Sequence, residues 1–189
     1  ISGMQLDGRS FFYVNPLEVL PEASLKDHGK RHVKVERQKW FGCACCPPNI
    51  IRLVSSLEDY IASVRDNALY LHLYVGGDLE ACVAGRDIHL NTQTNYPWDG
   101  KICMTFSSEV PVSFALNLRV PVWCSSWTLK LNGEPVTPDI TDGYLSLSRL
   151  WNPGDRLELS LDMPVSFLSA NPRIPEDAGK AALSRGPLV

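Results

Sequence analysis

The chain has 189 residues, 44% of them hydrophobic and 21% charged, and a formal net charge of −3 at pH 7. This length allows one large domain or two small ones with a sizeable hydrophobic core. Because charges of both signs are interspersed and no segment is strongly basic, the sequence argues against nucleic acid and anionic membranes as partners. No apolar run approaches the roughly 18 residues that span a membrane.

The two ends of the sequence suggest a piece of a longer protein. Ile1-Ser2-Gly3 contains no initiator methionine and no signal segment, and the apolar run of residues 186–189 stops where a strand would continue. The six cysteines are unevenly spaced, and Cys82, Cys103 and Cys124 lie far apart in strand-like segments. Because this pattern differs from the framework of a small secreted domain, we expect free thiols and a reducing, cytoplasmic location.

The N-terminal segment predicts a short hairpin followed by a polar loop. Residues 4–14 are rich in strand-forming side chains and contain a turn signal at Asp7-Gly8. From residue 17 to residue 39 the composition is polar, and His28 and His32 have the spacing of a metal-binding pair on a helix. Because the segment lacks apolar periodicity, we favour a solvated loop over a metal site.

Three cysteines cluster in residues 41–49, which read Phe-Gly-Cys-Ala-Cys-Cys-Pro-Pro-Asn. A disulfide between the neighbours Cys45 and Cys46 would strain the peptide that joins them. The prolines stiffen the turn, and Asn49 is a good N-cap for a following helix, whose N-terminus favours thiolates. Thiolates suit a soft or borderline metal, a nucleophile, or both. Small buried cysteines are the alternative, but three thiols so close together favour a chemical role.

After this cluster the periodicity changes from helical to strand-like. Apolar residues from Ile50 onward predict an amphipathic helix that ends at about Val64. Apolar and polar residues then alternate, with turn signals such as Asn132-Gly133 between segments. Strands are predicted over residues 69–75, 79–84, 87–94, 101–107, 112–120, 128–131, 144–148 and 156–161. Short strands without intervening helices predict a mainly β protein built as an antiparallel β-sandwich.

Two groups of side chains in the predicted sandwich have a functional and a structural interpretation. His72 and His89 occupy alternating strand positions, so we interpret them as ordinary residues of a sheet face. Several tryptophans near turns could stack on a sugar, although packing at the edge of the sandwich is the favoured interpretation. These tryptophans are Trp98, Trp123, Trp127 and Trp151.

Five segments carry a resemblance to a known family. They are residues 11–18, 40–49, 96–100, 170–173 and 179–189. In this order, along the whole chain, they resemble bacterial β-L-arabinofuranosidases of glycoside hydrolase family 127. The Cys-Cys-Pro-Pro-Asn core at residues 45–49 is highly specific, whereas each of the other segments is weak by itself.

The resemblance implies an order of domains. Members of the family have a helical (α/α)6 barrel followed by β-sandwich domains. Residues 1–65 would then be the C-terminal end of the catalytic barrel and residues 66–168 a β-sandwich. Residues 169–189 would form a loop and the start of a further strand or domain.

The resemblance also implies a reaction and its site. The family releases β-L-arabinofuranosyl residues with retention, using a zinc-bound cysteine thiolate as nucleophile and a glutamate as general acid/base. Cys45 matches the nucleophile and a zinc ligand, and Cys46 matches a second zinc ligand. Tyr13 falls where the family has an aromatic residue near the sugar. The remaining zinc ligands and the acid/base glutamate would lie outside this chain, which is then inactive alone.

Two function classes stay open at this point. The first is part of a zinc-dependent glycoside hydrolase that acts on an L-arabinofuranose-containing glycan, with a homodimer as the expected assembly. The second is a non-catalytic carbohydrate-binding or interaction sandwich with a structural thiol cluster. Glu18, Glu22 and Glu36 lie near the cysteines in sequence, but nothing singles one out as the catalytic acid.

Overall fold

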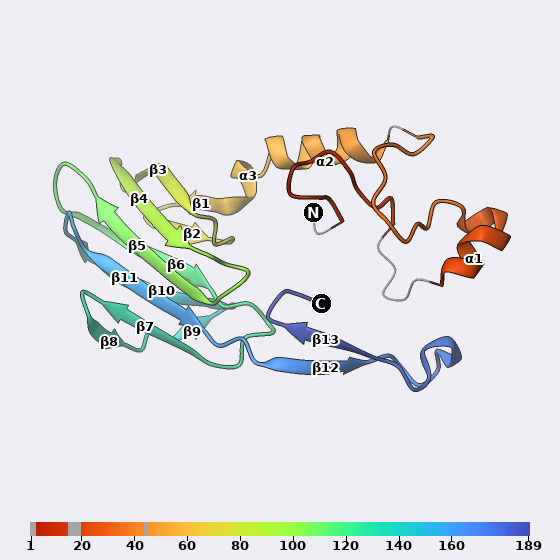
Figure 1. Cartoon of the computed structure of the whole chain (residues 1–189). Helices are drawn as coiled ribbons and strands as arrows, with labels where there is room; N and C mark the ends of the chain where they lie inside the picture. Colours follow the sequence, from red (N-terminus) through yellow and green to blue (C-terminus); the bar gives the residue numbers. More distant parts are fainter. Residues whose placement is uncertain (1–2, 15–19, 44) are drawn as a thin grey trace. The chain divides into compact units, whose positions relative to one another are not determined.

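The computed structural model describes residues 3–14, 20–43 and 45–189. The chain folds as two compact units, Ile1–Leu57 and Glu58–Val189 (Figure 1). Most of the regular structure is β, as the alternating pattern predicts. Within the described ranges, no helix combines the length and the hydropathy needed to cross a bilayer.

The first unit contains the predicted hairpin. Met4 forms a β-bridge with Phe11, and the Gly8 N–H donates to the Gln5 carbonyl at 2.8 Å in the turn, where Gly8 has a φ of +70°. Phe11 also pairs with Gln38, through two backbone hydrogen bonds of 3.0 and 2.9 Å. This second pairing connects the hairpin to the segment that leads into the cysteine cluster.

Part of the predicted polar loop is helical, which corrects the prediction. Helix α1 covers Pro21–Lys26 and the 3-10 helix η1 covers His28–Lys30. Local polar contacts explain these short helices, because Lys26 pairs with Glu22 at 2.9 Å. The Asp27 carboxylate also accepts a hydrogen bond from the Gly29 N–H at 2.8 Å and caps η1.

Helix α2 spans Cys46–Ser55, so it begins and ends earlier than the predicted helix. Cys45, rather than Asn49, occupies the N-cap position, and the prolines lie in the first turn, where a missing N–H costs no hydrogen bond. Hydroxyl groups near the C-terminus bond back to the preceding turn, as Ser56 Oγ does to the Arg52 carbonyl at 3.0 Å. The remainder of the predicted helix forms α3, Glu58–Ile61, and then strand β1, Ala62–Arg65.

The second unit is a β-sandwich of two sheets, seen as facing layers in Figure 1. The five-stranded sheet has the order β1, β2 (Ala68–Leu71), β6 (Val112–Arg119), β10 (Tyr144–Trp151) and β9 (Ile140–Thr141). The six-stranded sheet has the order β3 (Gly77–Val83), β4 (Arg86–Thr94), β5 (Lys101–Ser107), β11 (Arg156–Leu161), β7 (Trp127–Leu131) and β8 (Glu134–Val136).

One strand pair departs from the predicted antiparallel arrangement. Strands β2 and β6 are parallel, with Ala68 opposite Ala115 and Leu71 opposite Leu118. Between them the chain crosses to the other sheet as β3, β4 and β5 and returns as β6 in the same direction as β2. A parallel pair needs such a long crossover, which no local sequence signal reveals.

The core lies between the two sheets and follows the predicted alternation. The inward residues of β6 and β11 include Leu116, Leu118 and Leu159, all nearly fully buried. Trp151 is also buried, and its indole N–H donates to the Phe114 carbonyl at 3.1 Å. The interpretation of this tryptophan as a packing residue is therefore correct.

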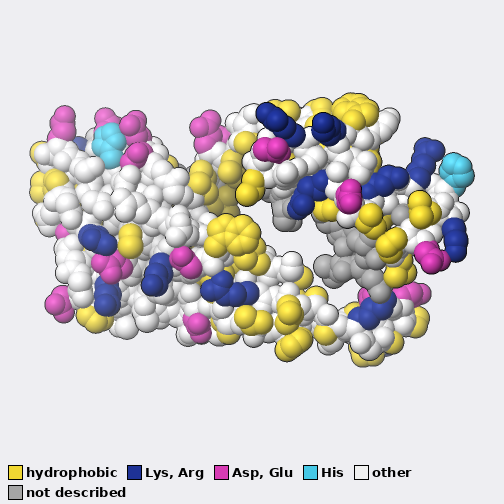
Figure 2. Space-filling view, in the orientation of Figure 1, with side chains coloured by type: hydrophobic (Ala, Val, Ile, Leu, Met, Phe, Trp, Pro, Cys, Tyr) yellow, Lys and Arg dark blue, Asp and Glu magenta, His cyan; other side chains and the backbone are white. Residues whose placement is uncertain are grey.

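A C-terminal hairpin follows the sandwich. Strand β12, Val165–Ser169, pairs with β13, Ala181–Arg185, and the 3-10 helix η2, Pro175–Asp177, lies in the connection. Strand β13 lies within residues 169–189, the range for which the sequence predicts a loop and the start of a further strand. Hydrophobic side chains are exposed along this hairpin (Figure 2), among them Val165, Phe167 and Leu183.

Candidate functional site

The cysteine cluster forms at the start of α2. Cys45 Sγ lies 3.2 Å from Cys43 Sγ and 3.8 Å from Cys46 Sγ, so it is the central thiol of the three. Cys43 and Cys45 are exposed and Cys46 is half-buried. The N-terminus of a ten-residue helix supplies partial positive charge next to these sulfurs. The cluster therefore lies at the electropositive end of a helix, with two sulfurs that a small molecule can reach.

Tyr13 reaches the cluster from the N-terminal hairpin, 32 residues away in sequence. Its hydroxyl lies 3.3 Å from Cys45 Sγ, and its ring packs against Phe41 with centroids 5.4 Å apart. Pairing of Phe11 with Gln38 brings the two segments together, since Tyr13 lies two residues beyond Phe11. The structure thus gathers all three predicted site residues, Tyr13, Cys45 and Cys46, in one place.

The three thiols also raise the pKa of the Tyr13 hydroxyl. Its hydrogen bond with Cys45 is the largest cause of a pKa well above the ordinary value, and contacts with Cys43 and Cys46 act in the same direction. The hydroxyl therefore stays protonated at neutral pH and can donate to a thiolate at Cys45. This role as a hydrogen-bond donor is one that sequence reasoning missed.

His32 is a second neighbour that sequence reasoning missed. Its ring lies edge-on to the Tyr13 ring, with centroids 5.8 Å apart. His28, its proposed partner in a metal pair, belongs instead to the 3-10 helix η1. The four-residue spacing is compatible with a metal pair, although the sequence favours a loop, and in the structure His32 lies beside Tyr13.

The sulfur positions allow a partial test of a zinc site. In a tetrahedral site with zinc–sulfur bonds of about 2.3 Å, ligand sulfurs lie roughly 3.8 Å apart. The 3.8 Å between Cys45 and Cys46 fits this spacing, whereas the 3.2 Å between Cys43 and Cys45 is too short for it. Among the described residues, no group of three or more His, Cys, Asp or Glu side chains is arranged to hold a metal. Cys45 and Cys46 therefore fit as two ligands of an incomplete set.

The structure does not single out one of Glu18, Glu22 and Glu36 as the catalytic acid. Glu18 lies outside the described residues. Glu22 is exposed and forms an ion pair with Lys26 on α1. Glu36 is also exposed, and its backbone carbonyl accepts a hydrogen bond from Gln38. Neither of the two described carboxylates has an observed contact with the thiols that would assign it a catalytic role.

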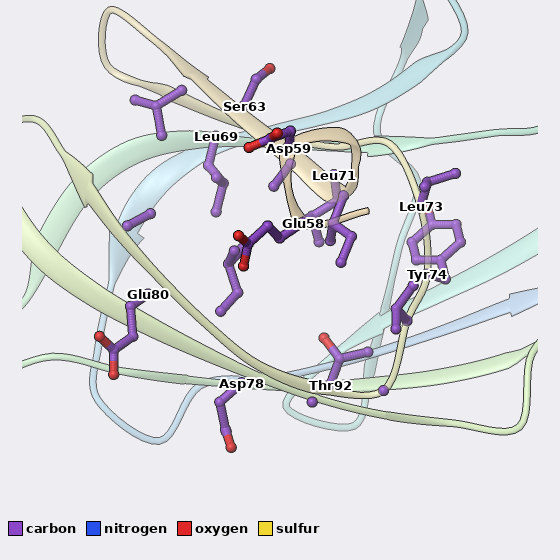
Figure 3. Close-up of a pocket in the computed structure, with 18 of the residues that line it drawn as sticks. Glu58, Asp59, Ser63, Leu69, Leu71, Leu73, Tyr74, Asp78, Glu80 and Thr92 are labelled. Atoms are coloured by element: carbon purple, nitrogen blue, oxygen red, sulfur yellow. The ribbon is translucent and has the colours of Figure 1, made fainter. Parts of the chain in front are cut away.

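The sandwich has a groove of its own, with a volume of about 760 Å³ (Figure 3). It lies along β1, β2 and β3, with Leu69 and Leu71 on its apolar side and Asp78 and Glu80 among its acidic residues. Cys82 also contributes to its lining, but no thiol cluster accompanies it. Because the thiol cluster combines a nucleophile, a hydrogen-bond donor and metal-ligating atoms, it is the stronger candidate for catalysis.

The sandwich also contains a polar network around His72. Ser63 Oγ lies 2.8 Å from His72 Nε2, and His72 Nδ1 lies 2.8 Å from the Tyr144 hydroxyl. The network connects β1 to β10 through the segment after β2. His89 lies 3.5 Å from Glu80 across the β3–β4 pair. His89 thus makes a cross-strand contact, as expected for a residue of a sheet face, whereas His72 lies just beyond the end of β2 and not on the predicted strand.

Models of protein families match most of the chain. Residues 68–163 match the model described as "Beta-L-arabinofuranosidase, GH127 middle domain". Residues 1–59 match "Beta-L-arabinofuranosidase, GH127 catalytic domain", and this range contains the thiol cluster and Tyr13. The boundary between the two matches falls close to the junction of the two compact units.

Individual relatives give the same result. The chain is 40% identical over 197 aligned residues to a non-reducing end β-L-arabinofuranosidase of Bifidobacterium longum subsp. longum, with 100% of this chain and 29% of that protein covered.

Two solved structures that superpose on this chain have the same GH127 description. A GH127 β-L-arabinofuranosidase from Geobacillus stearothermophilus T6 superposes with a TM-score of 0.87 at 49% identity, over 98% of this chain and 29% of that one. The GH127 β-arabinofuranosidase BT3674 superposes with a TM-score of 0.82 at 35% identity, over 98% of this chain and 30% of that one. The chain thus spans less than a third of the length of these relatives.

Proposed function

Because this chain belongs to glycoside hydrolase family 127, the β-L-arabinofuranosidase family, we propose that it is the nucleophile-bearing part of a retaining glycoside hydrolase. The proposed substrate is a glycan with terminal β-L-arabinofuranosyl residues, the class named for the relatives. The central place of Cys45, in contact with Cys43, Cys46 and Tyr13, is the observation that carries the proposal.

In the proposed reaction, the Cys45 thiolate attacks the anomeric carbon and forms a sulfur–carbon bond as the glycosidic oxygen leaves. An acid outside this chain donates the proton to that leaving oxygen. Water then attacks the anomeric carbon on the side opposite the sulfur and gives up a proton to the conjugate base of that acid. The sulfur–carbon bond breaks, and the Cys45 thiolate is released. Two displacements at one carbon retain its configuration.

The residues of this chain prepare the first displacement. Toward a thiolate at Cys45 the Tyr13 hydroxyl, 3.3 Å from the sulfur, would be the hydrogen-bond donor and would limit the directions available to the sulfur. The N-terminus of α2 stabilises negative charge on the sulfur. Cys45 and Cys46 would supply two thiolates to a zinc ion, which when bound holds a thiolate ionised and fixes its direction.

The alternative function is a carbohydrate-binding or interaction sandwich with a structural thiol cluster. The groove beside β1 and β3 would be its binding site. The match of residues 1–59 to a catalytic domain favours the hydrolase over this alternative. The reducing, cytoplasmic location and the homodimer stay proposals.

A cysteine series in the full-length protein tests the proposed nucleophile. Cys45→Ser should lose nearly all turnover of an aryl β-L-arabinofuranoside, since serine is a far poorer nucleophile at neutral pH. Cys46→Ser should mainly weaken zinc binding, and Cys43→Ser should be the mildest of the three. Cys82→Ser, at an exposed cysteine on β3, is the matched control and should retain activity.

Covalent labelling provides an independent measurement. A cyclophellitol-type inhibitor that reacts with the nucleophile should modify Cys45 in a peptide map of the full-length protein. Modification of Cys43 or Cys46 with Cys45 left free would refute the assignment, as would substantial turnover by Cys45→Ser.

A further inference from the structure

We propose that Cys43 is a resolving thiol for Cys45, so that the two form a reversible intramolecular disulfide when a small-molecule disulfide such as glutathione disulfide is present. The inference concerns regulation of the proposed catalytic site and rests on the proposed function for its consequence, which is loss of the nucleophile. Formation of the bond itself does not require the proposed catalytic function, because it follows from the arrangement of the two thiols.

The distances favour Cys43 over Cys46 as the partner of Cys45. Cys43 Sγ lies 3.2 Å from Cys45 Sγ, compared with 3.8 Å for Cys46 Sγ. A disulfide needs the sulfurs to approach to about 2.05 Å, a movement of roughly 1 Å from the observed separation. Cys45 and Cys46 are neighbours in sequence, so their disulfide would strain the peptide that joins them.

Access and position also distinguish this pair. Cys43 and Cys45 are both exposed, so a disulfide reagent can reach either sulfur. Cys43 lies outside α2, before the N-cap residue Cys45. Its side chain can therefore move without disturbing a helical hydrogen bond. Cys46 is the first residue of the helix and is half-buried.

The other cysteines lack a comparable thiol neighbour. Cys124 is buried and donates to the Ser126 carbonyl at 3.0 Å, and burial raises its pKa. Cys103 is half-buried on β5, and Cys82 is exposed on β3. The Cys43–Cys45 pair is therefore the site in the described part of the chain where two exposed thiols meet.

The chemistry balances as two thiol–disulfide exchanges. The Cys45 thiolate attacks one sulfur of glutathione disulfide, forms a mixed disulfide and expels one glutathione thiolate. The Cys43 thiolate then attacks Cys45 Sγ in the mixed disulfide and expels the second glutathione. The protein loses two electrons and two protons, and glutathione disulfide becomes two molecules of reduced glutathione.

Zinc and the disulfide compete for the same sulfur. Cys45 would supply a thiolate to zinc, and a sulfur held in a disulfide cannot serve as that ligand. The disulfide should therefore form more slowly in the zinc-loaded protein than in the metal-free protein. Cys43 would then act only when the metal is missing and would hold Cys45 in a reducible form rather than leave it open to irreversible oxidation.

The test uses the full-length protein in zinc-loaded and chelator-treated forms, each incubated with glutathione disulfide. Free thiols are then alkylated, and peptides are mapped without reduction. In the metal-free protein, Cys43 and Cys45 should be joined within one peptide, and a dithiol reductant followed by zinc should restore turnover. Cys43→Ser should accumulate a stable glutathione adduct on Cys45 instead, and Cys82→Ser should match the parent protein.

Three results would overturn the inference. They are a lasting glutathione adduct on Cys45 beside an alkylated Cys43, a Cys45–Cys46 link in its place, and equal rates of linkage with and without zinc. The peptide map does not depend on activity. If Cys45→Ser kept its turnover, the proposed function would fail, while the map would still decide whether Cys43 and Cys45 join.

Discussion

At the scale of single residues, the contact between Tyr13 and Cys45 is the most informative feature. A phenol held 3.3 Å from a thiol can orient the sulfur and share the negative charge that it carries as a thiolate. The raised pKa of Tyr13 keeps its proton in place, so the donor persists across neutral and moderately alkaline pH. Tyr13 is therefore proposed to position the nucleophile as well as to border the sugar.

Tyr13→Phe in the full-length protein tests this positioning role. The substitution keeps the ring against Phe41 and removes only the hydroxyl. A hydrogen bond to a charged group contributes about 1.5–3 kcal/mol, so kcat should fall by roughly 10- to 160-fold with little change in KM. Steady-state kinetics on an aryl β-L-arabinofuranoside would measure the two constants.

Tyr60→Phe is the matched control, because Tyr60 is an exposed tyrosine in the second compact unit. It should leave both constants unchanged. A rise in KM for Tyr13→Phe at constant kcat would show that the hydroxyl contacts the sugar without orienting the sulfur.

At the scale of elements, Asp155 connects the turns at one end of the sandwich. It is only 7% exposed. Its carboxylate accepts hydrogen bonds from the Asn132 side chain at 2.7 Å and the Asn152 N–H at 2.8 Å, and it pairs with Arg149 at 3.4 Å. Burial alone would raise the pKa of Asp155, but these contacts together hold it below the ordinary value.

Asp155→Ala should therefore destabilise the sandwich in a pH-dependent way. At neutral pH the loss should be about 2–3 kcal/mol, since the hydrogen bonds involve a charged, buried acceptor. Because the folded pKa is depressed, the carboxylate contributes its stability above the unfolded pKa of about 3.9 and loses it as pH falls through the folded value. The difference between variant and parent should shrink below about pH 4.

Denaturant unfolding of the 189-residue chain across this pH range would measure the effect. Asp139→Asn, at an exposed aspartate, is the control and should change stability little at any pH. A cost for Asp155→Ala that stays constant down to low pH would argue that the charge of the carboxylate is not what stabilises the turns.

Another element-scale prediction concerns Gly100, at the end of the Tyr-Pro-Trp-Asp-Gly segment before β5. The Leu161 N–H donates to the Gly100 carbonyl at 2.9 Å, which brings the two backbones together. A Cβ atom at residue 100 would collide with the carbonyl oxygen of Leu161. Gly100→Ala should therefore cost about 2–3 kcal/mol or more, measured as a lower Tm.

Gly76→Ala provides the contrast. Its added Cβ would meet the Thr92 carbonyl oxygen at 3.6 Å, an ordinary contact. Equal Tm values for the Gly100 and Gly76 variants would show that the β5 and β11 backbones separate easily at this point.

At the scale of the whole molecule, the sandwich should fold by itself. Its strands pair with one another around one core, and its turns are specified locally. A fragment from Glu58 to Pro164 should unfold cooperatively. A fragment that begins at Asp66 lacks β1, which pairs with β2 from Ala62 to Arg65, so its Tm should be lower by roughly 4–8 °C for each kcal/mol lost.

Calorimetry on both fragments would also test the predicted division at residue 65. Equal Tm values would favour a boundary at residue 65, whereas the absence of a transition in either fragment would argue against an independent sandwich.

The 189-residue chain alone should have no measurable glycosidase activity. In the proposed mechanism the acid/base residue lies elsewhere, and such a group contributes about 10²- to 10⁴-fold. Zinc affinity should also be weak, since Cys45 and Cys46 provide only part of a ligand set. Turnover that Cys45→Ala abolishes, or stoichiometric zinc that survives dialysis against a mild chelator, would contradict this prediction.

The sequence by itself determined most strands of the sandwich, most of its turns and the cysteine cluster, but not the strands β1, β8 and β9. Strands β5 and β11 have the predicted bounds because alternation of apolar and polar residues is a local property of a half-buried strand. The resemblance to the family likewise rested on short local segments, with Cys-Cys-Pro-Pro-Asn the most specific of the five, and the family matches confirm it.

Only the tertiary structure decided which distant segments meet. Residues 62–65 form a strand, despite their helical pattern, because β2 offers a row of backbone partners. The parallel pairing of β2 with β6 and the contact of Tyr13 with Cys45 depend on backbone pairing and packing between residues far apart in the chain. Periodicity within a short window reports which side of a segment is buried, but it contains no information about the partner that buries it.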